Sequence, residues 1–313
     1  MTTGVSKGAV ASVPDVERPL RALVGPTAAG KTELSVELAE RLGAEIVVVD
    51  SMTVYRGMDI GTAKPTREQR ARIPHHLLDI AEPTEPFSVA AFQDLARRAV
   101  AGISARNKVP LLVGGSGLYL RAVADDLRFP GTDPATRSLL EAEGAAIGAE
   151  RLHSRLAALD PRAASKIEPG NLRRTVRALE VTAITGKAFS EGASAWDRYA
   201  PEKLRAVGIA VDRETLRARA VARVHAMVEE GLLREVRGLI ERGASSFLTA
   251  SQAIGYLEFV QHLEGRITLE EAIERTARRT HELARRQMAW FRRDPRIRWF
   301  EDPTPADLEE HLR

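Results

Sequence analysis

The sequence predicts an α/β protein: a parallel sheet flanked by helices, with a helical insertion carried on that core. Short apolar runs alternate with helical patterns through the first 125 residues, an order typical of parallel sheets with helical crossovers. Between residues 130 and about 201 the apolar runs stop, and alanine-rich helical patterns replace them. One further run, over 204–211, indicates a strand that returns to the sheet, and helices are expected from 214 almost to the end.

The first strand is expected at residues 20–24, a short and mostly apolar run. It leads into G-P-T-A-A-G-K-T at 25–32, which matches G-x-x-x-x-G-K-[ST] at every fixed position. Residues 33–42 then carry apolar side chains at helical spacing. A β-branched run at 46–49 follows and ends on Asp50. This order of elements indicates a core like that of the P-loop NTPases.

The glycine-rich turn predicts a site for a diphosphate or triphosphate. Glycines let the backbone curl so that its amides point at an anion, and the N-terminus of the next helix adds its dipole. Lys31 contributes a full positive charge, and the Thr32 hydroxyl is expected to ligate Mg²⁺. A chance glycine-rich turn is disfavoured because a strand precedes the motif and a helix follows it. The predicted phosphate-binding residues are Gly25, Pro26, Thr27, Ala28, Ala29, Gly30, Lys31 and Thr32.

A polar, glycine-rich stretch at 51–65 predicts a long loop at the carboxyl edge of the sheet, where open α/β sheets bind ligands. The histidines at 75–76 could suggest a metal, but neighbours in a strand face opposite sides, so structural hydrogen bonds are favoured. A helix is expected at 87–106, with Ser88 as its N-cap, and a strand at 109–113.

A second glycine cluster, at 114–117, lies between that strand and a helix expected at 118–124, so it predicts another turn facing phosphate or substrate. In the insertion, Asp-Pro begins helical patterns over 133–159, and a further helix is expected at 171–185. Three arginines lie within about one turn at 173–177. The predicted parts are a flexible tail (1–17), a core (18–129 and 203–313) and a helical, RNA-facing insertion (130–202).

The last helical region is strongly basic, and only Glu282 and Asp294 oppose its arginines. Two tryptophans and two phenylalanines are interleaved with them. Arginine binds phosphate bidentately and stacks on bases, so this composition indicates an RNA-facing surface. The alternative, a solvated helix with aromatic residues in the core, is favoured for the tryptophans but not for the arginines. The arginines are Arg275, Arg278, Arg279, Arg285, Arg286, Arg292, Arg293, Arg296 and Arg298.

Composition narrows the class of protein. At 313 residues, about two domains are expected, and 44% hydrophobic and 28% charged residues are ordinary for a soluble globular chain. The absence of cysteine excludes disulfides, thiolate catalysis and cysteine-ligated zinc. No apolar run is long enough to span a membrane, and residues 1–17 lack the apolar segment of a signal peptide. We therefore expect a cytoplasmic protein, and a monomer.

Taken in order, the motifs closely resemble those of the tRNA dimethylallyltransferases, over roughly residues 19 to 293. A P-loop alone would be far less specific than this set. The cysteine-free sequence lacks the zinc finger of some eukaryotic members and resembles the bacterial type. The motifs are G-P-T-A-A-G-K-T at 25–32, D-S at 50–51, Y-R-G-M-D-I-G-T-A-K-P at 55–65, H-H-L at 75–77, G-G-S-G-L-Y at 114–119, R-A-L-E at 177–180, A-I-G-Y at 253–256 and R-Q-M-A-W-F-R at 286–292.

The resemblance implies transfer of a dimethylallyl group from dimethylallyl diphosphate to N6 of the adenosine 3′ of the anticodon in tRNA, with Mg²⁺. It implies that the 25–32 turn binds the donor diphosphate and that Asp50 faces the adenine amino group. It places an arginine on the donor phosphates, for which Arg223 is preferred to Arg219. The implied catalytic residues are Asp50, Lys31, Thr32 and Arg223. The implied tRNA contacts are Asp50, Ser51, Met52, Thr53, Ser116, Arg137, Arg173, Arg174, Thr175, Val176, Arg177 and Gln287, of which 173–177 match only loosely.

The chemistry suits these residues. Cleaving the bond from carbon to diphosphate oxygen concentrates negative charge on the leaving group, where Lys31 and the turn amides lie. Asp50 can accept the proton of the N6 nitrogen once the carbon–nitrogen bond is forming. The alternative is that its carboxylate acts on Mg²⁺ indirectly, through one of the groups bound to the ion. The rival functions are a P-loop nucleoside or nucleotide kinase, which leaves the basic region without a role, and an RNA-binding NTPase switch, for which no hydrolytic acid is evident.

Overall fold

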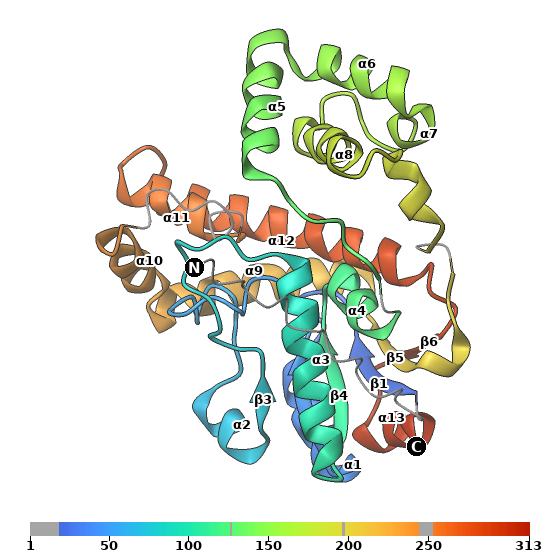
Figure 1. Cartoon of the computed structure of the whole chain (residues 1–313). Coiled ribbons are helices and arrows are strands. Elements are labelled where there is room, and N and C mark those ends of the chain that lie inside the picture. Colours follow the sequence, from blue (N-terminus) through green and yellow to red (C-terminus); the bar gives the residue numbers. More distant parts are fainter. Residues whose placement is uncertain (1–18, 126, 196–197, 244–252) are drawn as a thin grey trace, which may run out of the picture. The chain divides into compact units, whose positions relative to one another are not determined.

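Figure 1 shows the computed structural model of the chain, which describes residues 19–125, 127–195, 198–243 and 253–313. The tail predicted at 1–17 lies outside these residues. Contacts divide the chain into two compact units, a core unit formed by 1–126 with 200–313 and an insertion formed by 127–199. The sequence placed the boundaries of the insertion at 130 and 202. Each unit is described by itself below.

The core unit contains one sheet, in which the described strands all pair in parallel, as predicted. Its order is β3-β2-β4-β1-β5-β6. Apart from Arg21 and Glu45, the strands β1 and β2 are apolar, and nearly all of their residues are buried, which is typical of parallel strands covered by helices. The strands are β1 (Leu20–Val24), β2 (Ala44–Val48), β3 (His75–His76), β4 (Val109–Gly114), β5 (Leu204–Ala210) and β6 (Ile297–Glu301).

Alternate side chains of the sheet face two separate hydrophobic cores, because neighbouring residues of a strand point to opposite faces. Ala22 and Val24 of β1 belong to the core that includes Phe92 of α3. Leu23 belongs to the other core, with Val36 of α1 and residues of α13. The helices of the core unit are α1 (Lys31–Leu42), α2 (Arg67–Arg72), α3 (Val89–Ala105), α4 (Gly117–Ala124), α9 (Arg213–Glu230), α10 (Leu232–Glu241), α11 (Tyr256–Leu263), α12 (Leu269–Phe291) and α13 (Pro305–Leu312), with a 3₁₀ turn at Pro201–Lys203.

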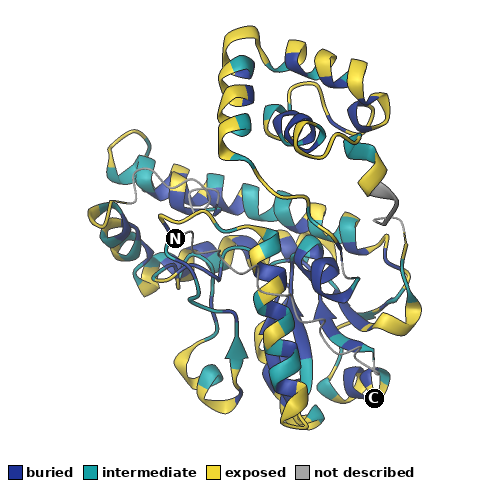
Figure 2. Ribbon diagram, in the orientation of Figure 1, coloured by how far each residue is buried: buried dark blue, intermediate teal, exposed yellow. Residues whose placement is uncertain are grey.

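Figure 2 shows the strands of the sheet buried and the outer faces of the helices exposed. Ser88 caps α3 through the Ala91 amide, as predicted. None of the helices in the described part of the chain is long and apolar enough to cross a membrane.

The sixth strand corrects the prediction that helices continue almost to the end of the chain. α12 ends at Phe291, and β6 then pairs with β5 in parallel along its whole length. Ile297 is buried and Arg298 is exposed, so the strand begins with the alternation of an edge strand. Arg298 therefore lies on a strand rather than on a helix. The prediction missed this strand because the aromatic and basic residues of the segment obscured its alternation.

The insertion is helical in its described residues, with a small core of its own that includes Leu140, Leu152 and Leu156. Asp133 caps its first helix, as predicted, and accepts hydrogen bonds from two amides of the first turn. Gly148 divides the helical stretch expected at 133–159 into two helices. The elements are α5 (Pro134–Ile147), α6 (Ala149–Leu159), α7 (Pro161–Ala164), α8 (Leu172–Thr185) and a 3₁₀ helix at Phe189–Ala195.

Candidate active site

Three loops of the core unit meet at the carboxyl edge of the sheet. They follow β1, β2 and β4, which are adjacent parallel strands and therefore end at the same edge. Backbone hydrogen bonds join two of the loops: the Val49 amide donates to the Val113 carbonyl at 2.8 Å, and the Ser116 amide donates to the Val49 carbonyl at 3.3 Å. The phosphate-binding turn, Asp50 and Ser116 are thereby brought to one edge, as the sequence predicted.

The phosphate-binding turn (residues 25–32) curls as its glycines require. Ala28 and Gly30 both have left-handed backbones, with φ of 63° and 84°, and Gly30 is the N-cap of α1. The turn therefore ends at a helix N-terminus, whose amides and dipole favour an anion. Lys31, the first residue of α1, donates from its Nζ to the Pro26 carbonyl at 2.6 Å. Its amine thus lies over the turn.

Two cations lie at this turn, and neither forms an ion pair with a carboxylate of the described residues. Arg223 of α9 donates to the Thr27 hydroxyl at 3.5 Å. Burial, and then the charge of Arg223, lower the pKa of Lys31 to about 8, although Asp50 opposes this shift. Burial also lowers the pKa of Arg223, opposed by Asp50 and Glu230. Such a site gains from a bound anion, because the anion supplies the missing negative charge.

Arg219, the other candidate on α9, is exposed, whereas Arg223 is half-buried against the turn. The structure thus separates the two arginines that the sequence placed four residues apart, and it assigns only Arg223 to the turn.

Asp50 directly follows Val49 at the end of the second strand. Its Oδ1 accepts hydrogen bonds from the amides of Met52 at 2.8 Å and Thr53 at 3.4 Å. Its Oδ2 makes no hydrogen bond with the described residues. Because the charge of Asp50 acts on both Lys31 and Arg223, the carboxylate lies close to the phosphate-binding turn. It is half-buried and can reach a ligand in this edge.

Gln287 of α12 links the two glycine-rich turns. Its Oε1 accepts a hydrogen bond from the Thr27 amide at 2.8 Å. Its Nε2 lies so close to Gly115 that a Cβ there would come within 2.6 Å of it. Glycine at 115 therefore permits this close approach, and a larger residue there would make the Gln287 amide shift. Trp290, one turn further along α12, is half-buried and packs against Gly117, in line with the prediction that the tryptophans serve packing.

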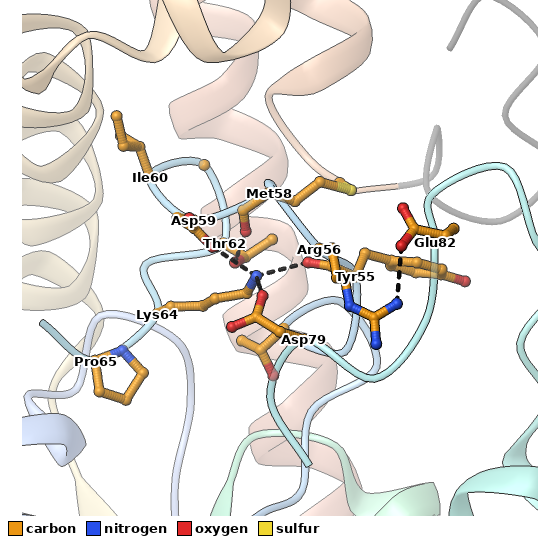
Figure 3. Close-up of polar contacts among 12 residues, drawn as sticks. Tyr55, Arg56, Met58, Asp59, Ile60, Thr62, Lys64, Pro65, Asp79 and Glu82 are labelled. Carbon is orange, nitrogen blue, oxygen red and sulfur yellow. Dashed lines mark hydrogen bonds and ion pairs between the residues drawn. The ribbon is translucent and has the colours of Figure 1, made fainter. Parts of the chain in front are cut away.

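The 51–65 loop is held from within by a buried lysine (Figure 3). The Nζ of Lys64 donates to the Tyr55 carbonyl and to one carboxylate oxygen each of Asp59 and Asp79, at 2.6, 2.6 and 2.5 Å. At the start of the loop, Ser51 and Met52 are half-buried, but Thr53 is only 6% exposed. The Thr53 side chain is enclosed by protein, so its predicted contact with RNA, which stays a prediction, would have to involve its backbone.

The two histidines of β3 make structural hydrogen bonds, as predicted. His75 Nδ1 lies 2.8 Å from the Ile73 carbonyl, and His76 Nε2 lies 2.7 Å from a carboxylate oxygen of Glu45. In the part of the chain that the structure describes, no three His, Asp or Glu side chains are grouped to hold a metal ion.

In the insertion, Glu180 gathers two of the predicted RNA contacts. This fully buried carboxylate accepts from Arg137 at 2.6 Å and from Arg177 at 2.7 Å. Arg173 and Arg174 are exposed, at the start of α8. Thr175 and Val176 are 0% and 2% exposed, so within 173–177 the side chains open to RNA are those of the arginines, and the contact itself stays a prediction. Both lie on the buried side of α8, whereas Arg173 and Arg174 are exposed.

The basic C-terminal region divides into structural and exposed arginines. The Arg296 side chain is 3% exposed and pairs with Asp125 and Asp294, and Arg279 pairs with the buried Glu258. The enclosed Arg296 stabilises the core unit and is not part of an RNA-facing surface, whereas the Arg279 side chain is still 37% exposed. Arg275 is half-buried and lies 3.9 Å from Glu271. The exposed members are Arg278, Arg285, Arg286, Arg292, Arg293 and Arg298.

Sequence reasoning missed Glu235 of α10. Its carboxylate accepts hydrogen bonds from three consecutive amides of the 51–65 loop and from the Tyr256 hydroxyl. No local motif marks this residue, because its partners in the loop lie more than 170 residues earlier in the chain. The sequence offered one indication: a long irregular loop at 51–65 needs hydrogen-bond partners for its backbone from another part of the chain.

Comparison with known proteins agrees with this geometry. The model of the IPP transferase family matches residues 53–294. A protein of Salinispora tropica named tRNA dimethylallyltransferase is 52% identical over 93% of this chain and 91% of its own. The crystal structure of the tRNA isopentenylpyrophosphate transferase of Bacillus halodurans has a TM-score of 0.67 and 42% identity, covering 94% of both chains. A eukaryotic dimethylallyltransferase captured acting on tRNA has a TM-score of 0.76 and 27% identity, covering 94% of this chain and 76% of its own.

Proposed function

The chain belongs to the IPP transferase family, and we propose that it transfers a dimethylallyl group from dimethylallyl diphosphate to tRNA, at N6 of the adenosine 3′ of the anticodon. Relatives about half identical to it over most of their length are named tRNA dimethylallyltransferase. A structural neighbour of similar fold acts on tRNA. The observation that carries the proposal is the grouping of Lys31, Arg223 and the Asp50 carboxylate at the phosphate-binding turn.

The turn holds the donor through its diphosphate. The turn ends at the N-terminus of α1, whose amides and dipole favour an anion. Lys31 and Arg223 supply full charges where the leaving group gains negative charge. Because both cations are partly buried and neither forms an ion pair with a carboxylate of the described residues, they interact strongly with a small polyanion. Burial weakens the charged form of Lys31 in the free protein, and the arriving diphosphate restores it.

The residues present fit a magnesium ion held jointly with the donor. Thr32 is exposed at the first turn of α1, and no cluster of three ligating side chains is present among the described residues. Mg²⁺ is commonly bound by one or two protein oxygens together with substrate phosphates. Thr32 would hold the ion, which would supply further neutralisation of the departing diphosphate.

Asp50 acts on the acceptor. Its Oδ1 is fixed by the Met52 and Thr53 amides, and this leaves Oδ2 for the exocyclic nitrogen of adenine. That nitrogen is a poor nucleophile because its lone pair is delocalised into the ring. As the new carbon–nitrogen bond forms, the nitrogen becomes acidic, and Asp50 takes its proton. The target base must leave its stack in the RNA loop to reach this carboxylate.

RNA is bound by arginine side chains in both units. On the core unit these are the exposed arginines near the end of α12, and on the insertion they are Arg137, Arg173, Arg174 and Arg177. Ser51, Met52, Ser116 and Gln287 lie at the carboxyl edge, in reach of a base bound beside Asp50. Arginine suits this task because its planar guanidinium pairs bidentately with phosphate.

A transfer assay tests the proposal directly. The protein is incubated with unmodified tRNA, dimethylallyl diphosphate and Mg²⁺, without ATP, and the RNA is digested and weighed by mass spectrometry. We expect the mass of one dimethylallyl group on a single adenosine next to the anticodon. Phosphate transfer from ATP to a small acceptor would support a kinase instead, and hydrolysis of a nucleotide without any modified RNA would support an NTPase switch.

A further inference from the structure

We propose that Glu235 is a positioning residue for the acceptor: through three backbone amides, it holds the 51–65 loop in the conformation that receives the RNA. This inference rests on the proposed function. Its subject is a residue of α10 that carries no motif and lies outside the phosphate-binding turn. The loop begins directly after Asp50, so its conformation determines what surrounds the carboxylate that faces the acceptor.

The two oxygens of Glu235 are saturated by donors. Oε2 accepts from the amides of Asp59 at 2.7 Å and Ile60 at 2.8 Å. Oε1 accepts from the Gly61 amide at 3.1 Å and from the Tyr256 hydroxyl at 2.7 Å. Three consecutive amides that converge on one acceptor form an anion-binding concavity of the kind that backbone nests provide. Here a side chain from a distant helix fills it.

Tyr256 closes the other side of this site. It is only 2% exposed, and burial together with the Glu235 charge raises its pKa. The hydroxyl therefore stays protonated and donates a hydrogen bond to Glu235. Its ring lies so close to Gly61 that a Cβ there would come within 2.6 Å of the ring. The loop is therefore fixed at 59–61 by hydrogen bonds to Glu235 and by contact with the Tyr256 ring.

A second charged centre holds the same loop from within. The Lys64 side chain is 1% exposed and bonds to Tyr55, Asp59 and Asp79, as Figure 3 shows. Asp59 contributes to both centres, since its carboxylate binds Lys64 and its amide binds Glu235. An irregular loop fixed by two charged residues loses little freedom on binding its ligand, and this improves affinity.

Glu235 does not touch the phosphate-binding turn. Its partners in the described residues all belong to the loop or to Tyr256, whereas the turn is contacted by Gln287 and Arg223. Loss of the Glu235 carboxylate should therefore weaken binding of the RNA acceptor and leave binding of the donor diphosphate unchanged. Loss of a residue that only stabilised the fold would weaken RNA binding and diphosphate binding together.

The test compares E235A with E241A. Glu241 is an exposed carboxylate of the same helix and forms no hydrogen bond or ion pair with the described residues of the loop. Transfer to a synthetic anticodon stem-loop RNA gives kcat and KM, and calorimetry gives the Kd of inorganic pyrophosphate with Mg²⁺. We expect kcat/KM for RNA to fall about tenfold or more in E235A, mainly through KM, since a charged acceptor of several hydrogen bonds is lost. E241A should match the wild type, and the pyrophosphate Kd should be unchanged in both.

Two further variants separate positioning from folding. E235Q retains one acceptor oxygen and should lie between the wild type and E235A. G61A displaces the loop from the side of Tyr256 and should reproduce the rise in KM without altering pyrophosphate binding. The inference is overturned if E235A behaves like E241A toward RNA, or if RNA kinetics, pyrophosphate affinity and melting temperature all fall together. Failure of the proposed function would look different, because the wild type itself would then transfer nothing.

Discussion

The phosphate-binding turn and the arginines of the insertion hold positive charge in opposite ways. At the turn, Lys31 and Arg223 donate to a backbone carbonyl and to a hydroxyl, and the pKa of Lys31 is lowered to about 8. In the insertion, Arg137 and Arg177 share the buried carboxylate of Glu180. The positive charges at the turn are therefore not neutralised by an ion pair and can bind a small polyanion. In the insertion, Glu180 neutralises part of the positive charge and in return fixes the direction of the two arginines.

This contrast suits two kinds of ligand. A departing diphosphate needs charge that is uncompensated until it arrives. An RNA backbone presents phosphates at fixed spacings, and a guanidinium must point correctly to pair with one of them. Burial would raise the pKa of Glu180, but hydrogen bonds from Arg177 and Arg137 lower it below its ordinary value, so the carboxylate stays ionised between them.

The largest expected effect is that of D50N, which keeps the shape of the side chain and removes its capacity to take a proton. The Asn oxygen still accepts the Met52 amide. We expect kcat for transfer to fall about 10³-fold, within the range typical of general bases, while RNA affinity changes little. Single-turnover transfer and RNA binding by fluorescence anisotropy measure the two. A variant that loses RNA affinity but retains the rate would show that Asp50 binds rather than reacts.

R223Q should weaken the diphosphate site strongly and leave RNA binding intact. Removing a half-buried, charged donor is expected to raise the Kd of pyrophosphate about thirtyfold. R219Q is the matched control, because Arg219 lies on the same helix and is exposed. Equal effects of the two variants on the pyrophosphate Kd, measured by calorimetry, would contradict the assignment of Arg223 to the turn.

The pH dependence of pyrophosphate binding follows from Lys31. Its pKa is about 8 in the free protein, and a bound anion raises it, so binding takes up a proton above pH 8. Affinity should be greatest below about pH 8 and should fall as pH rises, by at most roughly tenfold per pH unit from this one group. Pyrophosphate also titrates, so K31M serves as the reference. If the wild type and K31M show the same pH profile, Lys31 is not the group responsible.

E180Q tests whether RNA binding by the insertion depends on the orientation of its arginines or on its net charge. Removing the carboxylate makes the unit more positive, so net charge alone predicts tighter RNA binding. We expect roughly fivefold weaker binding instead, because Arg137 and Arg177 lose the acceptor that orients them. E143Q is the control, since it removes the partner of Arg155 from an exposed ion pair of the same unit. Tighter RNA binding by E180Q, with an unchanged melting temperature, would contradict the account.

The smallest effect is expected from single exposed arginines of α12. R285Q should weaken RNA binding about twofold and reduce the slope of log K against log salt by about one, because one phosphate contact is lost. R67Q, an exposed arginine of α2, should change neither. A salt slope identical to that of the wild type would remove Arg285 from the RNA-facing surface.

Local features of the chain were predictable from sequence. The glycines at 25 and 30, the strand ending at Asp50 and the N-cap at Ser88 each depend on neighbours in the chain, and the structure has the predicted turn, strand and helix. The burial of Thr175 and Val176 was missed because a short basic run was read as one surface, although a helix turns successive residues to different sides.

Features that depend on distant partners were not predictable. Arg296 reads as one more basic residue until Asp125, 171 positions earlier, is found beside it. Glu235 reads as a solvated glutamate of an amphipathic helix until the amides at 59–61 are found beside it. Periodicity reports which face of an element is buried, but not which charges the fold brings together.

The most direct test is a crystal structure with pyrophosphate, Mg²⁺ and an anticodon stem-loop RNA. The account predicts pyrophosphate in the 25–32 turn, in contact with Lys31 and Arg223, and an unstacked adenine whose N6 lies within hydrogen-bond distance of Asp50. Pyrophosphate bound elsewhere, or an Asp50 side chain turned away from the turn with no path for a base between them, would contradict it.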